Sequence, residues 1–465
     1  MPRPIRHPGR RVVAAVALAL GALALVAAPA NAGGSEGREE GGIRVVQVQG
    51  LLDAPNATLV RESIDDANDD EATLLVLQVD SDGALDVDVT PILDAIDESR
   101  VPIAVWVGPS GADASGAVTL IAQAAHFVSV SQGSGIGSAF PARLDRPGAV
   151  DEEELADRLA ALGEERGRDP DGARRLAGTR LSAEEAEQVE AIDSVEPIVG
   201  ELIVSLDGER IRTAAGRVTL STARVVGLGL DRRREPNQEV LFERLDLPDQ
   251  LLHTLISPSI AYFLFVAGLS LIVFEFFTAS IGLAGTTGAV AVLGATIGFS
   301  HLPVRWWAVA LLLAAMLGFA IDAQAGAGVG VWTAISTGLL VAGSLTLYGG
   351  SSRLDPPWWV VAVVVVGTVS FMVGGLAAMI RARFSTPTVG RQGLVGTMGT
   401  AEVAVDPDGV VLIDGSRWRA RTNRATPIPA GEAARVVAIE GLVLEVEPEE
   451  GAARDHRERR RGSGT

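Results

Sequence analysis

The stretch between residues 43 and 108 holds three apolar runs, IRVVQVQG (43–50), TLLVLQVD (73–80) and VPIAVWVG (101–108). Two stretches with helical spacing, NATLVRESIDDAND and VDVTPILDAIDES, separate these runs. Strands that are buried on both faces are continuously apolar, and parallel strands need crossover connections. The stretch therefore predicts a βαβαβ unit and an α/β domain with a mainly parallel sheet.

The same pattern continues to about residue 200. The charged segment DEEELADRLAALGEER (151–166) predicts an amphipathic helix, and LSAEEAEQVEAID (181–193) opens with a Ser-x-x-Glu capping box. We assign residues 33–200 to one α/β domain. Residues 201–255 contain shorter strand-like pieces, and we interpret them as a connector that packs against this domain or lies near the bilayer.

The first 32 residues have the composition of a signal peptide. Four arginines precede the apolar run VVAAVALALGALALVA, and APANA follows it with small side chains at Ala30 and Ala32. We therefore expect residues 1–32 to be removed and the α/β domain to lie outside the cytoplasm. The chain has no cysteine, so disulfides, thiol nucleophiles and thiolate metal sites are excluded.

The charge of the exported part is strongly negative. Residues 33–250 contain 43 Asp and Glu but only 20 Arg, and the whole chain has no lysine. Because an acidic surface repels phosphate backbones, nucleic acid is an unsuitable partner for this domain. We expect neither a metal nor another cofactor.

Residues 256–381 predict an integral membrane domain with about five helices, because their apolar segments approach or reach the length that crosses the hydrocarbon layer. The segments are SPSIAYFLFVAGLSLIVFEFF (257–277), GLAGTTGAVAVLGATIGFS (282–300), WWAVALLLAAMLGFAI (306–321), GVWTAISTGLLVAGSLTLY (330–348) and WWVVAVVVVGTVSFMVGGLAAMI (358–380). Tryptophans stand at segment edges, where headgroups accommodate them. The lipid bilayer is therefore an expected partner.

The orientation follows from the number of crossings. Five crossings that start from an exported domain place the C-terminus in the cytoplasm. Arg381 and Arg383, after the last segment, agree with the excess of positive charge on cytoplasmic loops. Arg305 and Arg353 would then lie outside, so the charges alone support this orientation only weakly.

Two acidic residues, Glu275 and Asp322, stand at the ends of membrane segments. Ionisable groups deep in lipid indicate function, and on that basis a transporter-like protein is one alternative. We favour interfacial turn residues whose carboxylates are hydrated.

Residues 388–449 return to a water-soluble pattern with alternating apolar positions, Gly-rich turns and about five short strands. This pattern predicts a small all-β barrel of the OB type. Trp418 is its single aromatic residue and acidic residues interrupt its arginines, so we expect it to bind a protein partner and not a nucleic acid strand. Residues 450–465 predict a basic disordered tail, with anionic lipid as an alternative contact.

The order of these segments resembles the long form of the NfeD (nodulation efficiency protein D) family. Three stretches carry the resemblance: GRDPDGARRLAGTRLSAEEAEQVEAID (167–193), SPSIAYFLFVAG (257–268), and GLVGTMGTAEVAVDPDGVVLIDGSRWRA with VVAIEGLVLEVEP in the barrel. The resemblance covers nearly the whole mature chain. It implies an exported Clp/crotonase-like α/β domain related to serine proteases, a multi-span α-helical membrane domain and an OB-fold. It also implies stomatin- or flotillin-like partners, a possible peptide ligand and self-association.

Active proteins of this type use a Ser-Lys dyad whose serine opens a helix in an Ala-Ala-Ser-Ala-Gly run. The matching stretch here is GADASGAVTLIAQAAHF (111–127). Aligning Pro109 and His126 with the family pattern places Gly116 at the nucleophile position and Ser115 one residue earlier. On a helix one residue turns by about 100°, so we expect the hydroxyl of Ser115 to face a different wall.

The general base of the dyad is also missing. Counting back from Gly167 and Arg168 places Val150 at the lysine position, and no lysine occurs elsewhere in the chain. Arginine stays protonated and is a poor base. We expect His126 to lie about 16 Å from Ser115 along one helix, which is out of reach.

The region of the oxyanion hole differs too. VDSDGAL (79–85) stands where the family has Asp-Thr-Pro-Gly-Gly, so Asp82 replaces the proline and Ala84 the second glycine. Gly83 still offers a backbone donor, but a nearby carboxylate opposes an oxyanion. We interpret Asp80 and Asp82 as turn residues at a strand end.

These losses predict a catalytically degenerate protease homologue that acts as a membrane scaffold. The competing hypothesis is an active endopeptidase in which Ser115 attacks, with Asp113 or water as its base. The transporter hypothesis rests on the acidic membrane residues alone.

Overall fold

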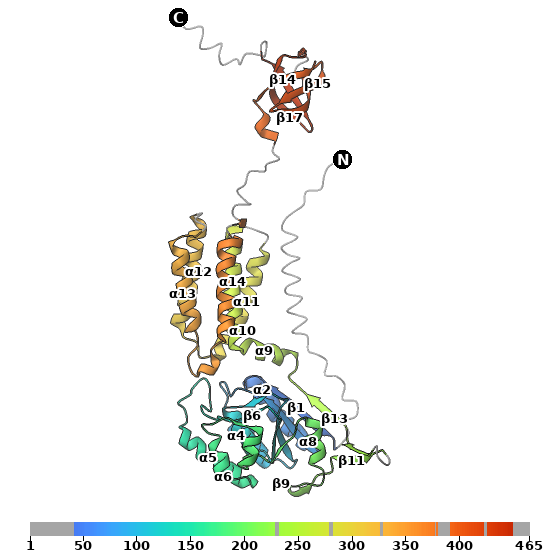
Figure 1. Cartoon of the computed structure of the whole chain (residues 1–465), viewed down its shortest axis with the longest axis vertical. Helices are drawn as coiled ribbons and strands as arrows, with labels where there is room; N and C mark the ends of the chain where they lie inside the picture. The colour runs from blue at the N-terminus through green and yellow to red at the C-terminus, as the bar shows by residue number, and fades with distance from the viewer. Residues whose placement is uncertain are drawn as a thin grey trace. The chain divides into compact units, whose positions relative to one another are not determined.

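The computed structural model describes residues 41–227, 232–278, 282–325, 329–376, 378–379, 391–422 and 426–449. The expected signal peptide, the expected tail, and Arg381 and Arg383 lie outside these residues. The described part contains an α/β sheet with its helices, a set of apolar helices and a closed barrel (Figure 1). The three predicted fold classes are confirmed.

The main sheet has six strands in the order β13-β1-β2-β3-β5-β8, and every neighbouring pair is parallel. Its strands are β1 (Ile43–Gln49), β2 (Leu74–Asp80), β3 (Ile103–Val107), β5 (Phe127–Val130), β8 (Ser194–Val195) and β13 (Val240–Glu243). The first three coincide with the apolar runs that predicted a parallel sheet.

The two faces of the sheet bury separate apolar clusters. On one face, Val46 and Leu75 belong to a cluster with helices α2 (Ala54–Asp69), α3 (Thr90–Glu98), α4 (Ala117–Ala124) and α5 (Glu152–Arg166). On the other face, Val45 and Leu74 belong to a cluster with α8 (Val199–Ser205). Alternate strand residues therefore enter opposite clusters, which explains why the runs are continuously apolar.

A smaller sheet lies beside the carboxyl ends of the main strands. It joins β4 (Asp113–Ala114), β6 (Gly135–Ile136) and β7 (Leu181–Ser182). Between β6 and α7 (Ala183–Gln188) the chain also contains α6 (Pro170–Arg175). The predicted capping box begins α7, because Ser182 Oγ accepts the N–H of Glu185 and the Glu185 carboxylate accepts the N–H of Ser182.

The segment interpreted as a connector contributes to the main sheet. Its strand β13 pairs with β1 and forms the edge of that sheet. Four further strands form two separate hairpins: β9 (Arg210–Thr213), β10 (Gly216–Thr219), β11 (Ala223–Val226) and β12 (Arg233–Pro236). Helix α9 (Leu247–Ile256) then leads to the membrane helices.

Helix α9 is fixed to the α/β domain by a buried polar contact. Nδ1 of His253 lies 2.7 Å from Oδ2 of Asp53, which is 2 % exposed and begins α2 as its N-cap. A Cβ on Gly50 would lie 3.0 Å from Nε2 of His253. The segment before the membrane therefore packs against the domain, as one of the two interpretations expected.

Four described helices are long and apolar enough to cross a membrane: α10 (Pro258–Thr278), α11 (Leu283–His301), α12 (Trp306–Gln324) and the segment Trp358–Leu376, which joins α14 (Trp358–Ser370) to the π-helix η3 (Phe371–Leu376). The fourth predicted segment, residues 330–348, forms α13 (Val331–Leu345), which has only 15 residues. At 1.5 Å per residue it is about 22 Å long, shorter than a typical hydrocarbon core.

The barrel forms a separate compact unit within residues 381–465. Its closed strand order is β14-β15-β16-β18-β17, from β14 (Met398–Val403), β15 (Asp408–Ile413), β16 (Ser416–Thr422), β17 (Ala433–Glu440) and β18 (Val443–Pro448). Alternate apolar residues such as Val411, Ile413 and Val446 fill its interior. The five predicted strands are therefore present.

Candidate functional site

The helix that resembles a nucleophile helix is shorter than its sequence pattern suggested. Helix α4 begins at Ala117, with Gly116 as its N-cap, and ends at Ala124. Ser115 precedes the helix and His126 follows it. The expectation that Ser115 and His126 share one helix is therefore wrong. Gly116 departs from helical geometry because its φ is 61° and its ψ is −143°.

Ser115 does not face an open groove. It is 8 % exposed, and its Oγ donates a hydrogen bond to the carbonyl oxygen of Gly137 at 2.9 Å. Among the described residues, no side chain that could take the proton is hydrogen-bonded to this hydroxyl. A buried hydroxyl that is bonded to a backbone carbonyl serves packing and local structure.

Gly116, the predicted nucleophile position, has no room for a side chain unless the backbone moves. A Cβ on Gly116 would lie 2.9 Å from the Cα of Gly83 and 3.3 Å from the carbonyl oxygen of Pro141. Both neighbours are backbone atoms, so relief requires movement of the main chain. The positive φ of Gly116 adds strain for any residue with a Cβ.

The backbone donors next to Gly116 are already used within the chain. The N–H of Gly116 donates to the carbonyl oxygen of Ser138 at 3.0 Å. The N–H of Gly83 makes a long hydrogen bond of 3.4 Å to Oγ of Ser81. An oxyanion hole requires donors that point at the developing charge, and these two donors point elsewhere.

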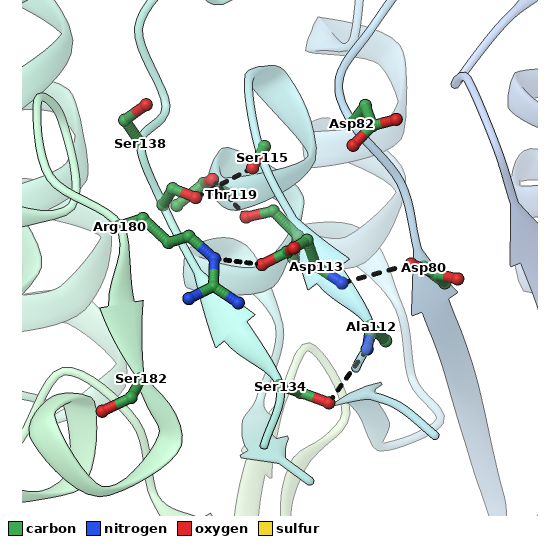
Figure 2. Close-up of polar contacts among 12 residues, drawn as sticks. Asp80, Asp82, Ala112, Asp113, Ser115, Thr119, Ser134, Ser138, Arg180 and Ser182 are labelled. Atoms are coloured by element: carbon green, nitrogen blue, oxygen red, sulfur yellow. Dashed lines mark hydrogen bonds and ion pairs between the residues drawn. The ribbon is translucent and has the colours of Figure 1, made fainter. Parts of the chain in front are cut away.

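No base is available beside Ser115 among the residues that we considered for this role. Val150, which we predicted at the family's lysine position, is half-buried and packs against the apolar core. Asp113 forms an ion pair with Arg180, and its N–H donates to Oδ1 of Asp80 at 3.1 Å. Figure 2 shows Asp113 between Asp80 and Arg180. An ion-paired carboxylate is a weak proton acceptor for a serine.

His126 supports the structure and does not reach the site. Its Nδ1 accepts the N–H of Ile103 at 3.1 Å, at the start of β3. Burial, followed by the positive charge of Arg166, lowers the pKa of His126 to about 4. The ring is therefore neutral near pH 7 and can accept this hydrogen bond.

Asp82 stands in an environment that disfavours its charge. Burial and the nearby carboxylates of Asp113 and Asp80 raise its pKa, whereas Arg353 opposes the rise. Figure 2 shows Asp82 apart from the contacts between Asp80 and Asp113. Arg353 comes from the loop between α13 and α14, and Nη1 donates to the carbonyl oxygen of Asp82 at 3.3 Å.

The contact of Arg353 with this region could not be found by sequence reasoning, which placed Arg353 only on an external loop. The two residues are 271 positions apart. A polar contact over this separation leaves no periodic pattern in the sequence.

The two acidic residues of the membrane domain lie near the ends of α10 and α12, and each accepts hydrogen bonds from the start of the next helix. Oδ2 of Asp322 accepts hydrogen bonds from the N–H and Oγ1 of Thr333, in the first turn of α13, at 2.6 and 2.7 Å. Glu275 accepts the N–H groups of Gly282, Ala284 and Gly285, at the start of α11. Carboxylates stabilise helix N-termini in this way.

Asp322 is only 5 % exposed, so the expectation of a hydrated carboxylate is wrong for this residue. Capping explains both acids without a transport pathway. Among the described residues, no group of three or more His, Cys, Asp and Glu side chains is arranged to hold a metal ion.

Family models match two parts of the chain. The NfeD integral membrane domain matches residues 259–381, and the NfeD-like C-terminal, partner-binding domain matches residues 391–448. The membrane-bound protease PH1510 from Pyrococcus horikoshii is 26% identical over 419 residues, which cover 86% of this chain and 92% of that protein.

Solved structures are similar to separate parts of the chain. The 1510-N membrane protease specific for a stomatin homolog from Pyrococcus horikoshii is 22% identical, with a TM-score of 0.38, and the match covers 46% of this chain and 98% of that one. The C-terminal domain of stomatin operon partner protein 1510-C from the same organism is 34% identical, with a TM-score of 0.13, and the match covers 13% of this chain and 97% of that one.

The membrane and C-terminal matches follow one another in the order that the family pattern requires, and the protease relative covers most of the chain. The chain therefore contains an NfeD integral membrane domain followed by an NfeD-like C-terminal domain, and it is similar to a membrane-bound protease over most of its length.

Proposed function

We propose that this NfeD protein is a membrane scaffold whose protease-like domain no longer hydrolyses peptides. The observation that carries this proposal is the geometry of Gly116, which has a positive φ and a Cβ position 2.9 Å from the Cα of Gly83. A serine at that position would force the main chain to shift, and Ser115 donates to a backbone carbonyl instead. With no lysine in the chain, neither half of a Ser-Lys dyad is available.

A hydrolysis assay tests this part of the proposal. The purified full-length chain in detergent is incubated with fluorescently labelled casein, beside the Ser115→Ala variant. We expect equal rates for both chains, at the level of buffer alone. A rate above buffer that disappears in Ser115→Ala would establish the competing hypothesis, an endopeptidase that uses Ser115.

We also propose that the barrel binds a stomatin- or flotillin-like membrane protein. The matching family model describes a partner-binding domain, and the relatives include a protease named as specific for a stomatin homolog. The test is co-purification of such a protein with the full-length chain and with a chain that ends at residue 388. Equal recovery with both chains would contradict a role for the barrel.

In the proposed topology the α/β domain is exported and the barrel is cytoplasmic. Five membrane crossings produce this arrangement, and it therefore requires the short helix α13 to cross. Because the chain has no cysteine, the single substitutions Gln132→Cys and Ser416→Cys, both at exposed positions, can report the two sides. In intact cells an impermeant maleimide should label the Gln132→Cys chain and leave the Ser416→Cys chain unlabelled. Labelling of both chains would show that the topology is different.

A further inference from the structure

The loop between α13 and α14 contacts the α/β domain on both sides of Gly116. Nη2 of Arg353 donates to Oγ of Ser138 at 2.7 Å, and Nη1 donates to the carbonyl oxygen of Asp82 at 3.3 Å. Ser138 is the residue whose carbonyl accepts the N–H of Gly116, and Asp82 directly precedes Gly83. The guanidinium therefore bonds to the two segments that enclose the former nucleophile position.

The backbone of the same loop is also docked. The N–H of Ser351 donates to the carbonyl oxygen of Leu144 at 2.9 Å. Gly350 has a φ of 77°, and a Cβ on it would lie 2.4 Å from that same oxygen. Leu144 in turn donates its N–H to the carbonyl oxygen of Ala84 at 2.9 Å. The loop thus continues a series of backbone hydrogen bonds that begins next to Gly83.

Apolar side chains also pack between the α13–α14 loop and the α/β domain. One buried cluster includes Leu85 and Leu144 of the α/β domain together with Tyr348 and Leu354 beside the loop, and each of the four is no more than 2 % exposed. Burial of large apolar side chains favours docking because it removes their surface from water. The contact therefore has an apolar centre in addition to its hydrogen bonds.

We infer that the α13–α14 loop occupies the edge formed by Asp82, Ser138 and Leu144 beside Gly116, and that a peptide reaches this edge only when the loop leaves it. The inference rests on the proposed function in that it concerns the same part of the α/β domain. An extended peptide binds to such an edge mainly through backbone hydrogen bonds. The carbonyl oxygens of Asp82 and Leu144 are already used by Arg353 and Ser351.

Arg353 also borders a pocket. This pocket has a volume of about 310 Å³, and its lining includes Gly50, Asp53, Asp82, His253 and Arg353. The guanidinium itself is exposed. Arg353 can therefore turn away from Ser138 without breaking a buried contact, whereas Leu354 holds the loop more firmly.

Labelling of a single cysteine measures whether the loop covers this edge of the α/β domain. In the full-length chain Ser138→Cys places the only thiol beneath Arg353, and a thiol still accepts a weak hydrogen bond. The probe is a maleimide attached to polyethylene glycol, which is as bulky as a peptide. We expect Arg353→Ala to increase the labelling rate about fivefold, since it removes hydrogen bonds to a charged group.

A second variant acts through the loop backbone. Gly350→Val places a branched side chain against the carbonyl oxygen of Leu144, so it should displace the loop and increase labelling more than Arg353→Ala does. Arg234→Ala is the matched control, because Arg234 of β12 bonds to Asp207, outside the loop and the segments that the loop contacts. Unchanged labelling of the thiol from Ser138→Cys in both loop variants, with the chains folded, would overturn the inference.

A disulfide provides a measurement that does not depend on loop variants. The hydrogen bond between Ser351 and Leu144 brings their Cα atoms within about 6 Å, a distance that a disulfide spans. The pair Leu144→Cys and Ser351→Cys should therefore crosslink in oxidised membranes, whereas Leu144→Cys with Ser300→Cys should not. Equal crosslinking in the two pairs contradicts the docked loop. Hydrolysis of casein by a chain that does crosslink would contradict only the proposed loss of activity.

Discussion

A Cβ atom on Gly116 would lie 2.9 Å from the Cα of Gly83. This approach leaves no space for a side chain at the position that the sequence comparison with the family pattern predicts for the nucleophile. We expect Gly116→Ser to lower the free energy of unfolding by about 2 kcal/mol, through the contact and the positive φ, and to produce no hydrolysis.

The measurement is denaturant unfolding of the full-length chain in detergent, with casein hydrolysis assayed in parallel. Gly148→Ser is the matched control, because a Cβ there has no neighbour within 4 Å. Equal free energies of unfolding for the two variants would mean that the backbone at Gly116 accommodates a Cβ without cost, which contradicts this prediction.

His126 gives the α/β domain a dependence on pH. Its pKa is about 4 in the folded chain and 6.5 for the unperturbed side chain, so the unfolded state binds more protons between these values. The contribution of His126 to the free energy of unfolding is therefore fully present above pH 6.5, and it decreases as the pH falls from 6.5 toward 4. Between pH 6.5 and 5 the loss should be about 1.5 kcal/mol.

The check is the free energy of unfolding against pH for the natural chain and for His126→Asn, in which a neutral side chain retains an acceptor for the N–H of Ile103. The variant should lack this part of the pH dependence. Two parallel curves would show that His126 does not titrate as described.

Asp322 stabilises the membrane domain as the cap of α13. Asp322→Ala removes both hydrogen bonds to Thr333 and should lower the free energy of unfolding by about 2 kcal/mol, because the freed N–H is buried. Asp322→Asn retains an acceptor and should lose less. Thermal unfolding in detergent ranks the three chains. If alanine and asparagine are equivalent to aspartate, the capping role is wrong.

The pair formed by His253 and Asp53 should couple α9 to the α/β domain. His253→Ala leaves the buried carboxylate of Asp53 with only the N–H of Asn56 at 3.2 Å. We expect a coupling free energy of about 1 to 3 kcal/mol in a double-mutant cycle with Asp53→Asn. Additive effects of the two substitutions would indicate that the contact contributes nothing to stability.

The sequence was sufficient to predict the elements whose residue pattern is local and repeats along the chain. Continuous apolar runs predicted β1, β2 and β3 because both faces of the sheet are covered, and alternating residues predicted the barrel strands. The capping box at Ser182 depends on residues three apart and was equally visible.

Other features depend on contacts between distant residues. Strand β13 looked like a connector because only its pairing with β1 makes it part of the sheet. The start of α4 was misplaced because the pairing of β4 with β6 holds Ala114 extended, and Gly116 then turns the chain. No local pattern reports either contact, and the same is true of the bond between Arg353 and Ser138.

The most direct test of the central claim is covalent labelling of the purified full-length chain by a fluorophosphonate, followed by mass spectrometry of the peptide that contains Ser115. We predict no adduct on this peptide, because the hydroxyl donates to the carbonyl oxygen of Gly137 and lacks a base. An adduct on Ser115 that forms with the native chain and is absent after denaturation would contradict the account.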